Sequence, residues 1–555
     1  MEDKIFVTVN GNDRREIKKG TTFYELSKSY KDRYQTDIML AKSGNVLYEL
    51  SARINKSMDV EFIDLTNQDG VRVYSRSLSF IMVKAIKDLF GIETKIFIEH
   101  SINGNLYCEV YRDGVKIDND FLLCVKKKMM ETIEADLPIE RLMVSVDEAT
   151  ELASKYGMED KIRLLAYRRV SYVSLYRLEN LYDYYYGYML PFTGLLKIFD
   201  LSLYEKGFLL RMPSTKNPNK PETYDNFEKI SAVFMEQLEW CKLMEVKCIA
   251  DLNDVIADGS FAELVRINEA LHEKKIAYIA DKITENFDRI KVVLIAGPSS
   301  SGKTSFAQRL CVQLRVNGIK PHAIGMDDYF LNRDQTPLGQ DGRPDFESLN
   351  ALDLHKFNND INNLINGREA VIPSYDFITG KRSIAGRKMK LRKGEIIVIE
   401  GIHGLNTELT RDIPEENKFR IFVSPMTQLN IDAHNCISTS DSRLIRRIVR
   451  DFQFRGNTAA QTIDSWPNVR RGEEQNIFPY QQNADIVFNS ATIYELSVLK
   501  AFIVPLLYKI DKTMPEYITA NRILKFLEYF LCAGTEAIPD NSLLKEFVGG
   551  SVFNV

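Results

Sequence analysis

An apolar run that leads directly into a glycine-bounded loop constrains the fold of this chain more than any other feature. Residues 290–296 read IKVVLIA, a short apolar segment of the kind that forms a buried parallel strand. The loop that follows, GPSSSGKT at 297–304, matches the pattern G-x-x-x-x-G-K-T, and residues 305–315 continue as a helix. The sequence therefore predicts a strand, a phosphate-binding loop and a helix within a parallel α/β domain.

Each residue type in this loop suits the binding of a nucleotide phosphate. Glycines allow backbone N–H groups to close around phosphate oxygens, and the helix N-terminus favours an anion. We expect Lys303 to contact the β and γ oxygens and Thr304 to ligate Mg²⁺, so the expected cofactors are ATP and Mg²⁺. The predicted nucleotide-binding residues are Gly297, Pro298, Ser299, Ser300, Ser301, Gly302, Lys303, Thr304 and Ser305.

Two further apolar segments each end in a carboxylate. Residues 321–326 lead to Asp327, and residues 396–399 lead to Glu400. In an open parallel sheet, the carboxyl ends of the strands line the ligand crevice. Asp327 is therefore predicted to take a proton from an attacking hydroxyl, and Glu400 has the position of a second acid at the metal.

Four arginines lie within residues 443–450, and Arg455 follows them. Such a cluster is usually a solvated helix face, and an RNA-binding face is another interpretation. Because the phosphate loop and both carboxylates lie in the same part of the chain, a group that clamps the transferring phosphate is the favoured interpretation.

The motifs of this region resemble, in order, those of the uridine kinase and phosphoribulokinase family. They are GPSSSGKTS, MDDYF, PSYDF, IEGIHGL, RLIRRIVRDFQFRG and ADIVFNS, between about 288 and 495. The resemblance implies that Asp327 is the base for the acceptor hydroxyl and that Glu400 and Thr304 hold Mg²⁺. It also implies that Arg450 and Arg455 contact the transferring phosphate, with Lys303 in the catalytic group.

The same resemblance implies a binding site for the acceptor. Glu347 and Arg447 fall where uridine kinases hold the ribose, and Tyr375 and Phe377 fall where they pack the base. The chain departs from the family at Gly380, which replaces the histidine that reads the pyrimidine. Two further departures are Asn457, in place of an arginine, and Phe330, in place of a tyrosine. The expected acceptor is therefore a nucleoside-like small molecule whose base the sequence does not identify.

The first 65 residues predict a small α+β unit. A strand at 5–9, a turn at 10–13, a helix capped by Thr21 or Thr22, and strands around 46–50 and 58–63 give the layout of a ubiquitin-like β-grasp fold. This unit resembles a TGS domain, which is found at the front of threonyl-tRNA synthetases and some regulatory GTPases. A generic β-grasp unit with no nucleic-acid role is the alternative.

Three segments between about 70 and 270 resemble the second additional domain of threonyl-tRNA synthetase, which follows the TGS domain in that family. They are RSLSFIMVKAIKDLFG, MMETIEADLPIERLMVSVDEATELA and YDYYYGYMLPFTGLLKIFDL. The family's editing site uses an H-x-x-x-H and a C-x-x-x-H pair, which fall here on Arg76, Phe80, Tyr185 and Met189. These side chains cannot rebuild that chemistry, so we expect no editing of mischarged tRNA. The tyrosines at 182–188 could stack on bases, although packing is the commoner role.

The length of 555 residues predicts three or four domains and a multidomain α+β and α/β fold. The expected units are a β-grasp domain at 1–65, an α+β synthetase-editing-like domain at 70–270, a P-loop domain at 275–510 and a helical extension at 511–555. The C-terminal helices are expected to pack on the P-loop domain.

Composition limits the partners and the cellular compartment that we expect for the protein. The net charge of −4 argues against a basic nucleic-acid binder as a whole. Seven scattered cysteines, the absence of a signal-like N-terminus and the lack of a long apolar run predict a cytoplasmic protein without a membrane span. The sequence does not indicate an oligomeric state.

The leading hypothesis is an ATP- and Mg²⁺-dependent kinase that phosphorylates a hydroxyl of a nucleoside-like molecule. The second is an RNA-associated regulator, in which the N-terminal half binds tRNA or ribosomal RNA and nucleotide hydrolysis acts as a switch; a kinase that acts on RNA itself combines the two. A third is that the N-terminal domains sense a free amino acid or nucleotide and regulate the kinase.

Overall fold

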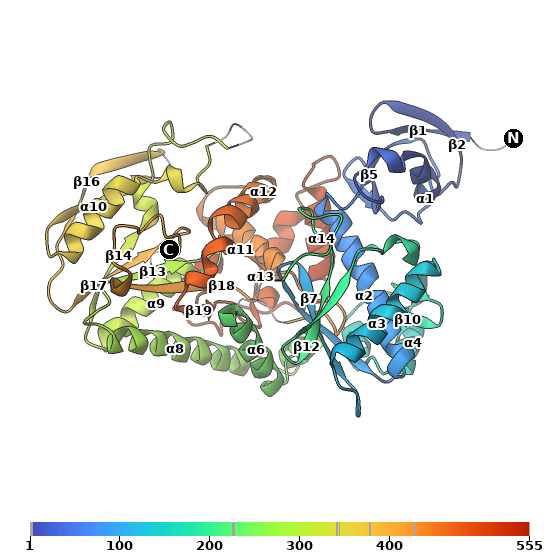
Figure 1. The fold of residues 1–555 in the computed structure, drawn as a ribbon, viewed down its shortest axis with the longest axis horizontal. Helices are drawn as coiled ribbons and strands as arrows, with labels where there is room; N and C mark the ends of the chain where they lie inside the picture. The colour runs from blue at the N-terminus through green and yellow to red at the C-terminus, as the bar shows by residue number, and fades with distance from the viewer. Residues whose placement is uncertain are drawn as a thin grey trace.

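The computed structural model describes residues 4–224, 228–339, 342, 344–376, 379–426 and 429–553 (for 384 and 385, the backbone only). In Figure 1 the N-terminal unit and an α+β region lie at one end, a parallel α/β region lies at the other, and most of the C-terminal helices lie between them. The predicted combination of α+β and parallel α/β regions is confirmed.

The N-terminal unit contains β1 (Lys4–Val9), β2 (Asp13–Lys18), α1 (Phe23–Ser27), the 3₁₀ helix η1 (Lys28–Arg33), β3 (Leu40–Ser43), β4 (Val46–Tyr48) and β5 (Met58–Ile63). The sheet order is β2-β1-β5-β3-β4, with β1 and β5 parallel. Thr22 caps α1 through a reciprocal bond with Glu25, which confirms one of the two predicted caps. Strand β3 was absent from the prediction because its two buried residues, Leu40 and Ala41, are adjacent and do not alternate with polar ones.

The α+β region contains α2 (Gln68–Phe90), β6 (Lys95–Ile102), β7 (Asn105–Tyr111), α3 (Asn119–Glu134), β8 (Ile139–Ser145), α4 (Val146–Lys155), α5 (Glu159–Ala166), β9 (Tyr172–Leu178), β10 (Leu181–Asp183), β11 (Asp200–Tyr204) and β12 (Gly207–Arg211). Its two antiparallel sheets have the orders β10-β9-β8 and β11-β12-β7-β6. Helix α2 begins at Gln68, where the side chain of Asn67 caps its first turn.

Three helices lead into the α/β region: α6 (Glu228–Leu243), α7 (Ile249–Ala257) and α8 (Phe261–Glu285). The region itself contains β13 (Val292–Ala296), α9 (Lys303–Val316), β14 (Lys320–Gly325), the 3₁₀ helix η3 (Met326–Tyr329), α10 (Leu354–Ile365), β15 (Ala370–Asp376), β16 (Lys381–Met389), β17 (Glu395–Glu400), β18 (Lys418–Ser424) and β19 (Ile486–Asn489). All neighbours in the sheet β14-β17-β13-β18-β19 are parallel. The central strand β13 is fully buried, as its apolar run predicts.

The remaining helices are α11 (Thr439–Phe454), α12 (Ala459–Asn476), α13 (Glu495–Leu507), α14 (Tyr517–Leu527) and α15 (Lys545–Val548). Helix α15 packs on α11, and α14 packs on α13. Helix α14 also contacts β4 of the N-terminal unit. Just before this helix, the carbonyl of Lys512 accepts a hydrogen bond from the side chain of Asn45 at 3.1 Å. The C-terminal helices therefore contact both ends of the molecule, whereas the sequence predicted packing on the P-loop domain alone.

A segment just before α11 joins the α/β region to the α+β region. The backbone N–H of Ile98 in β6 donates to the carbonyl of Ala433 at 2.8 Å, and the side chain of Asn430 donates to the carbonyl of Ile98 at 3.0 Å. Beside them, buried Asp183 accepts from Lys161 at 2.5 Å and pairs with His434 at 2.6 Å. Buried ion pairs tolerate little rearrangement, so this junction holds the two regions in one arrangement.

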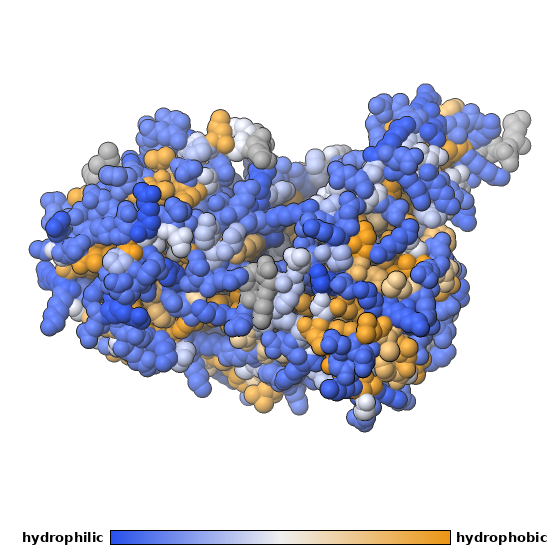
Figure 2. All heavy atoms as spheres, viewed as in Figure 1, coloured by the Kyte–Doolittle hydropathy of each residue, from blue (hydrophilic) through white to orange (hydrophobic). Residues whose placement is uncertain are grey.

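Figure 2 shows a largely hydrophilic face, with apolar residues gathered in the area of α3 and β12. Leu123 and Met130 of α3 are among the large apolar side chains that stay exposed. None of the helices in the described ranges is both long enough and apolar enough to cross a membrane.

Candidate phosphoryl-transfer site

The loop 297–304 lies between the central strand β13 and the start of α9. Gly302 has φ +79°, a left-handed conformation that favours glycine, and it forms the N-cap of α9. At Gly297, an added Cβ would lie 1.9 Å from the carbonyl oxygen of Val423 in β18, so only glycine allows this approach. These two glycines therefore set the backbone of the loop, in agreement with the motif.

Two predicted acidic residues lie at the neighbouring strand ends. Glu400 ends β17, where it is level with Ile295 of β13 and Gly325 of β14, and Asp327 follows β14 in η3. The hydroxyl of Thr304 donates to the Glu400 carboxylate at 3.2 Å. The parallel sheet thus brings Thr304, Glu400 and Asp327 to one edge, as the sequence predicted.

Buried charges of both signs surround Lys303. Its ammonium donates to the carbonyl of Pro298 at 3.2 Å. Burial lowers the pKa of Lys303, while the charges of Glu400, Asp327 and Glu546 oppose that shift. Burial also raises the pKa of Asp327, and it raises the pKa of Glu400 to about 7. The groups are close enough to interact electrostatically, and a bound cation would favour both carboxylates in their charged form.

The residues present fit a magnesium ion. The Thr304 hydroxyl and the Glu400 carboxylate are the kind of oxygen ligands that Mg²⁺ takes in proteins. Within the described ranges, no group of three or more His, Cys, Asp or Glu side chains is arranged to hold a metal. Mg²⁺ is usually held by one or two protein oxygens together with substrate phosphates, and Thr304 and Glu400 supply oxygens of this kind.

Two of the clustered arginines on α11 donate hydrogen bonds to backbone carbonyls of the loop. Arg443 forms a buried ion pair with Glu473, and its guanidinium also donates to the carbonyl of Ser299 at 3.3 Å. Arg446 pairs with Glu495 and donates to the carbonyl of Ser300 at 3.4 Å. These buried side chains position the loop backbone and are not free to clamp a phosphate.

The other arginines of the cluster lie closer to the acidic edge. Arg447 donates to the Ser299 hydroxyl at 2.5 Å, and Arg450 donates to Asp451 at 2.9 Å. Burial and the neighbouring Arg450 lower the pKa of Arg455 to about 10, whereas the charge of Asp327 opposes that shift. Arg450 and Arg455 therefore stand near Asp327, where the sequence places the transferring phosphate.

Three of the four predicted acceptor residues lie in the described part of the chain. Burial raises the pKa of Glu347 to about 7, although the charge of Arg447 opposes the shift. Tyr375 packs its ring 5.6 Å from that of Phe330, which in turn packs against Phe346. The structure thus brings Glu347 and Arg447 together, and it places Tyr375 in an aromatic cluster. The predicted Phe377 lies outside the described residues.

At Gly380, where the family resemblance expects a base-reading histidine, the structure places an arginine. A Cβ added at Gly380 would lie 2.8 Å from the Nε of Arg333, and the backbone N–H of Arg333 donates to the Gly380 carbonyl at 2.9 Å. Gly380 also has φ +68°, which disfavours other residue types. The acceptor end of the site is therefore reshaped around Arg333.

Sequence reasoning missed two carboxylates on the loop. Glu473 of α12 accepts the backbone N–H of Ser299 at 3.0 Å. Glu546 of α15 accepts the backbone N–H of Ser305 at 3.2 Å and its hydroxyl at 2.8 Å. Glu546 lies 241 positions beyond Ser305, and no local pattern marks either glutamate. Only the tertiary structure identifies them.

Comparison with known proteins gives two separate likenesses. Residues 292–497 match the model of the Phosphoribulokinase / Uridine kinase family. The uridine kinase of Macrococcus caseolyticus is 28% identical over 197 residues, which cover 35% of this chain and 86% of that protein. A solved structure of a possible uridine kinase from Bacillus stearothermophilus is 20% identical, with a TM-score of 0.26 over 38% of this chain and 97% of that one.

The N-terminal half is similar to a different class of protein. The threonine–tRNA ligase of Syntrophotalea carbinolica is 32% identical over 197 residues, which cover 34% of this chain and 31% of that protein. The chain spans about a third of the length of the threonine–tRNA ligases it matches. Residues 292–497 are therefore a domain of the phosphoribulokinase / uridine kinase family, fused behind a region similar to threonine–tRNA ligases.

Proposed function

We propose that this protein is an ATP- and Mg²⁺-dependent kinase that transfers the γ-phosphate to a hydroxyl of a nucleoside-like small molecule. The observation that carries the proposal is the convergence of Lys303, Asp327 and the Thr304–Glu400 pair at the ends of three adjacent parallel strands. Phosphoryl transfer needs little covalent chemistry from the protein, so it depends on positioned charges of this kind.

The roles follow from the chemistry of each side chain. Lys303 and the backbone N–H groups of the loop hold the phosphates, and Arg450 and Arg455 offset charge on the transferring group. Asp327 accepts the proton of the attacking hydroxyl, and its raised pKa favours that step near neutral pH. When bound through Thr304 and Glu400, Mg²⁺ supplies further charge neutralisation at the phosphate oxygens.

We further propose that Glu347 and Arg447 hold a sugar-like part of the acceptor and that Tyr375 and Phe377 pack against its ring. Arg333 beside Gly380 replaces a neutral base-reading group with a cation. Pyrimidine nucleosides should not be favoured over other nucleosides.

The N-terminal half is proposed to consist of a TGS-like β-grasp domain at 1–65 and an editing-like domain at 70–270, followed by the kinase domain at 275–510 and a C-terminal extension at 511–555. The strand order β2-β1-β5-β3-β4 and the likeness to threonine–tRNA ligases support the first two. The editing positions remain without the chemistry of that site: Phe80 packs on Tyr185 at 5.5 Å, and Met189 contacts Ser77.

The test is ADP release by the full-length protein with Mg-ATP. Ribo- and deoxyribonucleosides are supplied one at a time and then bulk tRNA, with Lys303→Ala as the blank. Turnover with one or a few nucleosides supports the proposal. ADP release with tRNA alone overturns it in favour of an RNA-directed enzyme, and the absence of any Lys303-dependent release overturns both.

A further inference from the structure

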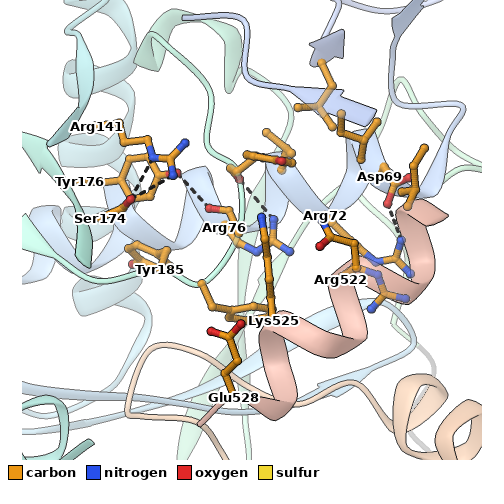
Figure 3. A pocket seen from close by; sticks show the side chains of 18 of the residues that line it. Asp69, Arg72, Arg76, Arg141, Ser174, Tyr176, Tyr185, Arg522, Lys525 and Glu528 are labelled. Carbon is orange, nitrogen blue, oxygen red and sulfur yellow. Dashed lines mark hydrogen bonds and ion pairs between the residues drawn. The ribbon is translucent and has the colours of Figure 1, made fainter. Parts of the chain in front are cut away.

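A cavity of about 270 Å³ lies far from the phosphate loop, between three parts of the chain that are distant in sequence. Its walls come from the β3–β4 turn, from α2 with β8, β9 and residues 184–188, and from α14 (Figure 3). A cavity of this size suits a small ligand and lies near the lower end of the range for small-molecule pockets.

The cavity is rich in positive charge. Its basic lining residues are Arg72, Arg76, Arg141, Arg168, Arg522 and Lys525. Four of them have carboxylate partners within 4 Å: Arg72 pairs with Asp69, Arg522 with Asp441, Arg168 with Glu528 and Arg141 with Glu49. In the described part of the chain, no carboxylate lies within ion-pair distance of the other two, so the cavity holds two excess cations.

Those two cations, Arg76 of α2 and Lys525 of α14, come from different walls of the cavity and both line it (Figure 3). Arg76 donates to the carbonyl of Tyr188 at 3.2 Å, which is a contact with a neutral group. Burial lowers the pKa of Lys525, and the nearby charge of Arg141 lowers it further, whereas the charges of Glu528 and Glu49 oppose the shift. The free protein therefore holds Lys525 in a place that disfavours its charge, which an anion would reverse.

Aromatic rings line the cavity beside each cation. The guanidinium of Arg76 lies 5.0 Å from the ring centre of Tyr186, and the ammonium of Lys525 lies 5.4 Å from that of Tyr188. Gly187, between the two tyrosines, leaves room for this arrangement, because a Cβ there would lie 2.2 Å from the Arg76 guanidinium carbon. The pair of rings offers a surface on which a planar group can stack.

We propose that this cavity is a second ligand site, which binds a small molecule that carries a phosphate group and a planar ring, such as a nucleoside monophosphate. Arg76 and Lys525 pair with the phosphate, since guanidinium groups bind phosphate oxygens in a fixed geometry. Tyr186 and Tyr188 contact the ring. The site occupies the position of the editing-like residues Arg76 and Tyr185, but its charge is new.

A small molecule fits the observations better than a nucleic-acid strand does. Helix α14 crosses the cavity opposite α2, so the walls enclose the ligand from the N-terminal unit, the α+β region and the C-terminal helices together. A strand would need a continuous basic groove leading out of the cavity.

The cavity also adjoins the kinase domain. Arg522 in its wall pairs with Asp441, which lies in the first turn of α11. The same helix carries Arg447 and Arg450 to the phosphate-loop site. One ion pair therefore separates the second site from a helix that contributes to the first, which gives the ligand a direct route to influence it.

Calorimetric titration of the full-length Lys303→Ala protein tests the proposal, since this background weakens binding at the loop. The probes are adenosine and uridine 5′-monophosphate, inorganic phosphate, the parent nucleosides and a short single-stranded RNA. The site variant is Arg76→Gln with Lys525→Gln, and the matched control is Arg266→Gln with Lys127→Gln, which removes two exposed cations elsewhere. Gly187→Ala is a second variant, which displaces Arg76 without removing it.

We expect the monophosphates to bind at least about tenfold more tightly than the nucleosides, and the site variant to weaken them by about tenfold or more. Gly187→Ala should weaken binding, and the control pair should not. Equal binding in the site variant and the control overturns the proposal, as does the absence of monophosphate binding. Binding of RNA alone, with the same dependence on Arg76, overturns it in favour of a nucleic-acid site.

A second and independent observation concerns the C-terminal helix. Ser305 is the third residue of α9, so its backbone N–H is one of the free donors that a phosphate uses at a helix N-terminus. In this structure the buried Glu546 carboxylate takes that donor and the Ser305 hydroxyl. Leu543 lies against Gly302, and the ring of Phe547 lies 5.0 Å from the Arg446 guanidinium.

We infer that α15 is an autoinhibitory segment, whose carboxylate occupies a phosphate position of the loop until nucleotide displaces it. This inference rests on the proposed nucleotide site. Two like charges at one donor set are unfavourable, so the segment must withdraw when a triphosphate binds.

Nucleotide titration of wild type, Glu546→Gln and Asp540→Asn tests the inference; Asp540 is an exposed carboxylate of the same tail. Glu546→Gln should tighten ADP binding by about three- to tenfold, whereas Asp540→Asn should leave it unchanged. Unchanged or weaker binding by Glu546→Gln overturns the inference. If wild type binds no nucleotide at all, the proposed function itself fails.

Discussion

The phosphate loop and the cavity between α2 and α14, which are both proposed to bind phosphate, differ in how their charges are arranged. In the loop, a short local segment supplies backbone N–H groups and one lysine, and carboxylates surround that lysine. In the cavity, side-chain cations from distant segments outnumber their carboxylate partners by two. The cation of the loop is therefore surrounded by carboxylates, whereas the cavity has more cations than carboxylate partners.

This difference has a consequence for the role of metal. A triphosphate approaching the loop meets Glu400, Asp327 and Glu546, so a divalent cation is needed to offset repulsion between like charges. An anion that enters the cavity meets Arg76 and Lys525 with no unpaired carboxylate opposite them. The loop should depend on Mg²⁺, and the cavity should not.

Removal of the loop lysine is expected to have the largest effect. Lys303→Ala should abolish turnover, with a loss of about 10³- to 10⁵-fold, because it removes the only side-chain cation of the loop. The protein should stay folded, because Asp327 and Glu400 already have raised pKa values and can take up protons. ADP release and thermal unfolding measure the two effects. Turnover near that of wild type would disprove the assignment of the loop.

Replacement of the proposed base should have the next largest effect. Asp327→Asn should lower kcat by about 10²- to 10⁴-fold with little change in ATP affinity, because the amide cannot accept the proton of the hydroxyl. Steady-state kinetics and nucleotide titration separate the two quantities. If kcat stays the same while ATP binding weakens, Asp327 acts in nucleotide binding and another group is the base.

Acceptor binding should depend on pH through Glu347. Its pKa is raised to about 7, so the carboxyl is mostly protonated below that pH and charged above it. If the charged form holds the sugar hydroxyls, the apparent KM for the acceptor should fall about tenfold between about pH 6 and about pH 8. Glu347→Gln should give a high KM for the acceptor that no longer changes with pH. A pH profile that this substitution leaves intact would remove Glu347 from the acceptor site.

The smallest effect is expected for ligand binding at the cavity when metal is removed. Because turnover at the loop should need metal, this experiment distinguishes the two sites. With EDTA present, turnover should cease, whereas binding of a nucleoside monophosphate at the cavity should change by less than about twofold. Calorimetry with and without EDTA measures the second quantity. Loss of that binding on metal removal would show that the cavity does not act as a metal-independent anion site.

Much of the kinase region could be predicted because its signals are local. The apolar run before Gly297, the glycines and Lys303 lie within a few residues of each other, and parallel strands necessarily bring Asp327 and Glu400 to the same edge. The arginine cluster was harder to interpret. Sequence alone does not show that Arg443 and Arg446 are buried against glutamates while Arg450 lies near the acidic edge.

Other elements gave too weak a signal. The buried residues of β3 are adjacent and do not alternate with polar ones. The first residues of α2, Gln68 and Asp69, are polar, so only the Asn67 cap marks its start. Glu473 and Glu546 belong to unremarkable helical segments, and nothing nearby in the sequence indicates that they accept hydrogen bonds from the loop.

By itself, the sequence determined that this chain contains a phosphate loop in a parallel α/β domain, and it predicted that the editing-like positions, including Arg76 and Tyr185, lack the chemistry of an editing site. Only the tertiary structure decided what stands in their place. Arg76 and Lys525 are separated by most of the chain, and they meet because α14 folds back onto the N-terminal regions. Short-range patterns report local backbone chemistry, whereas a charge balance between distant side chains exists only after the chain has packed.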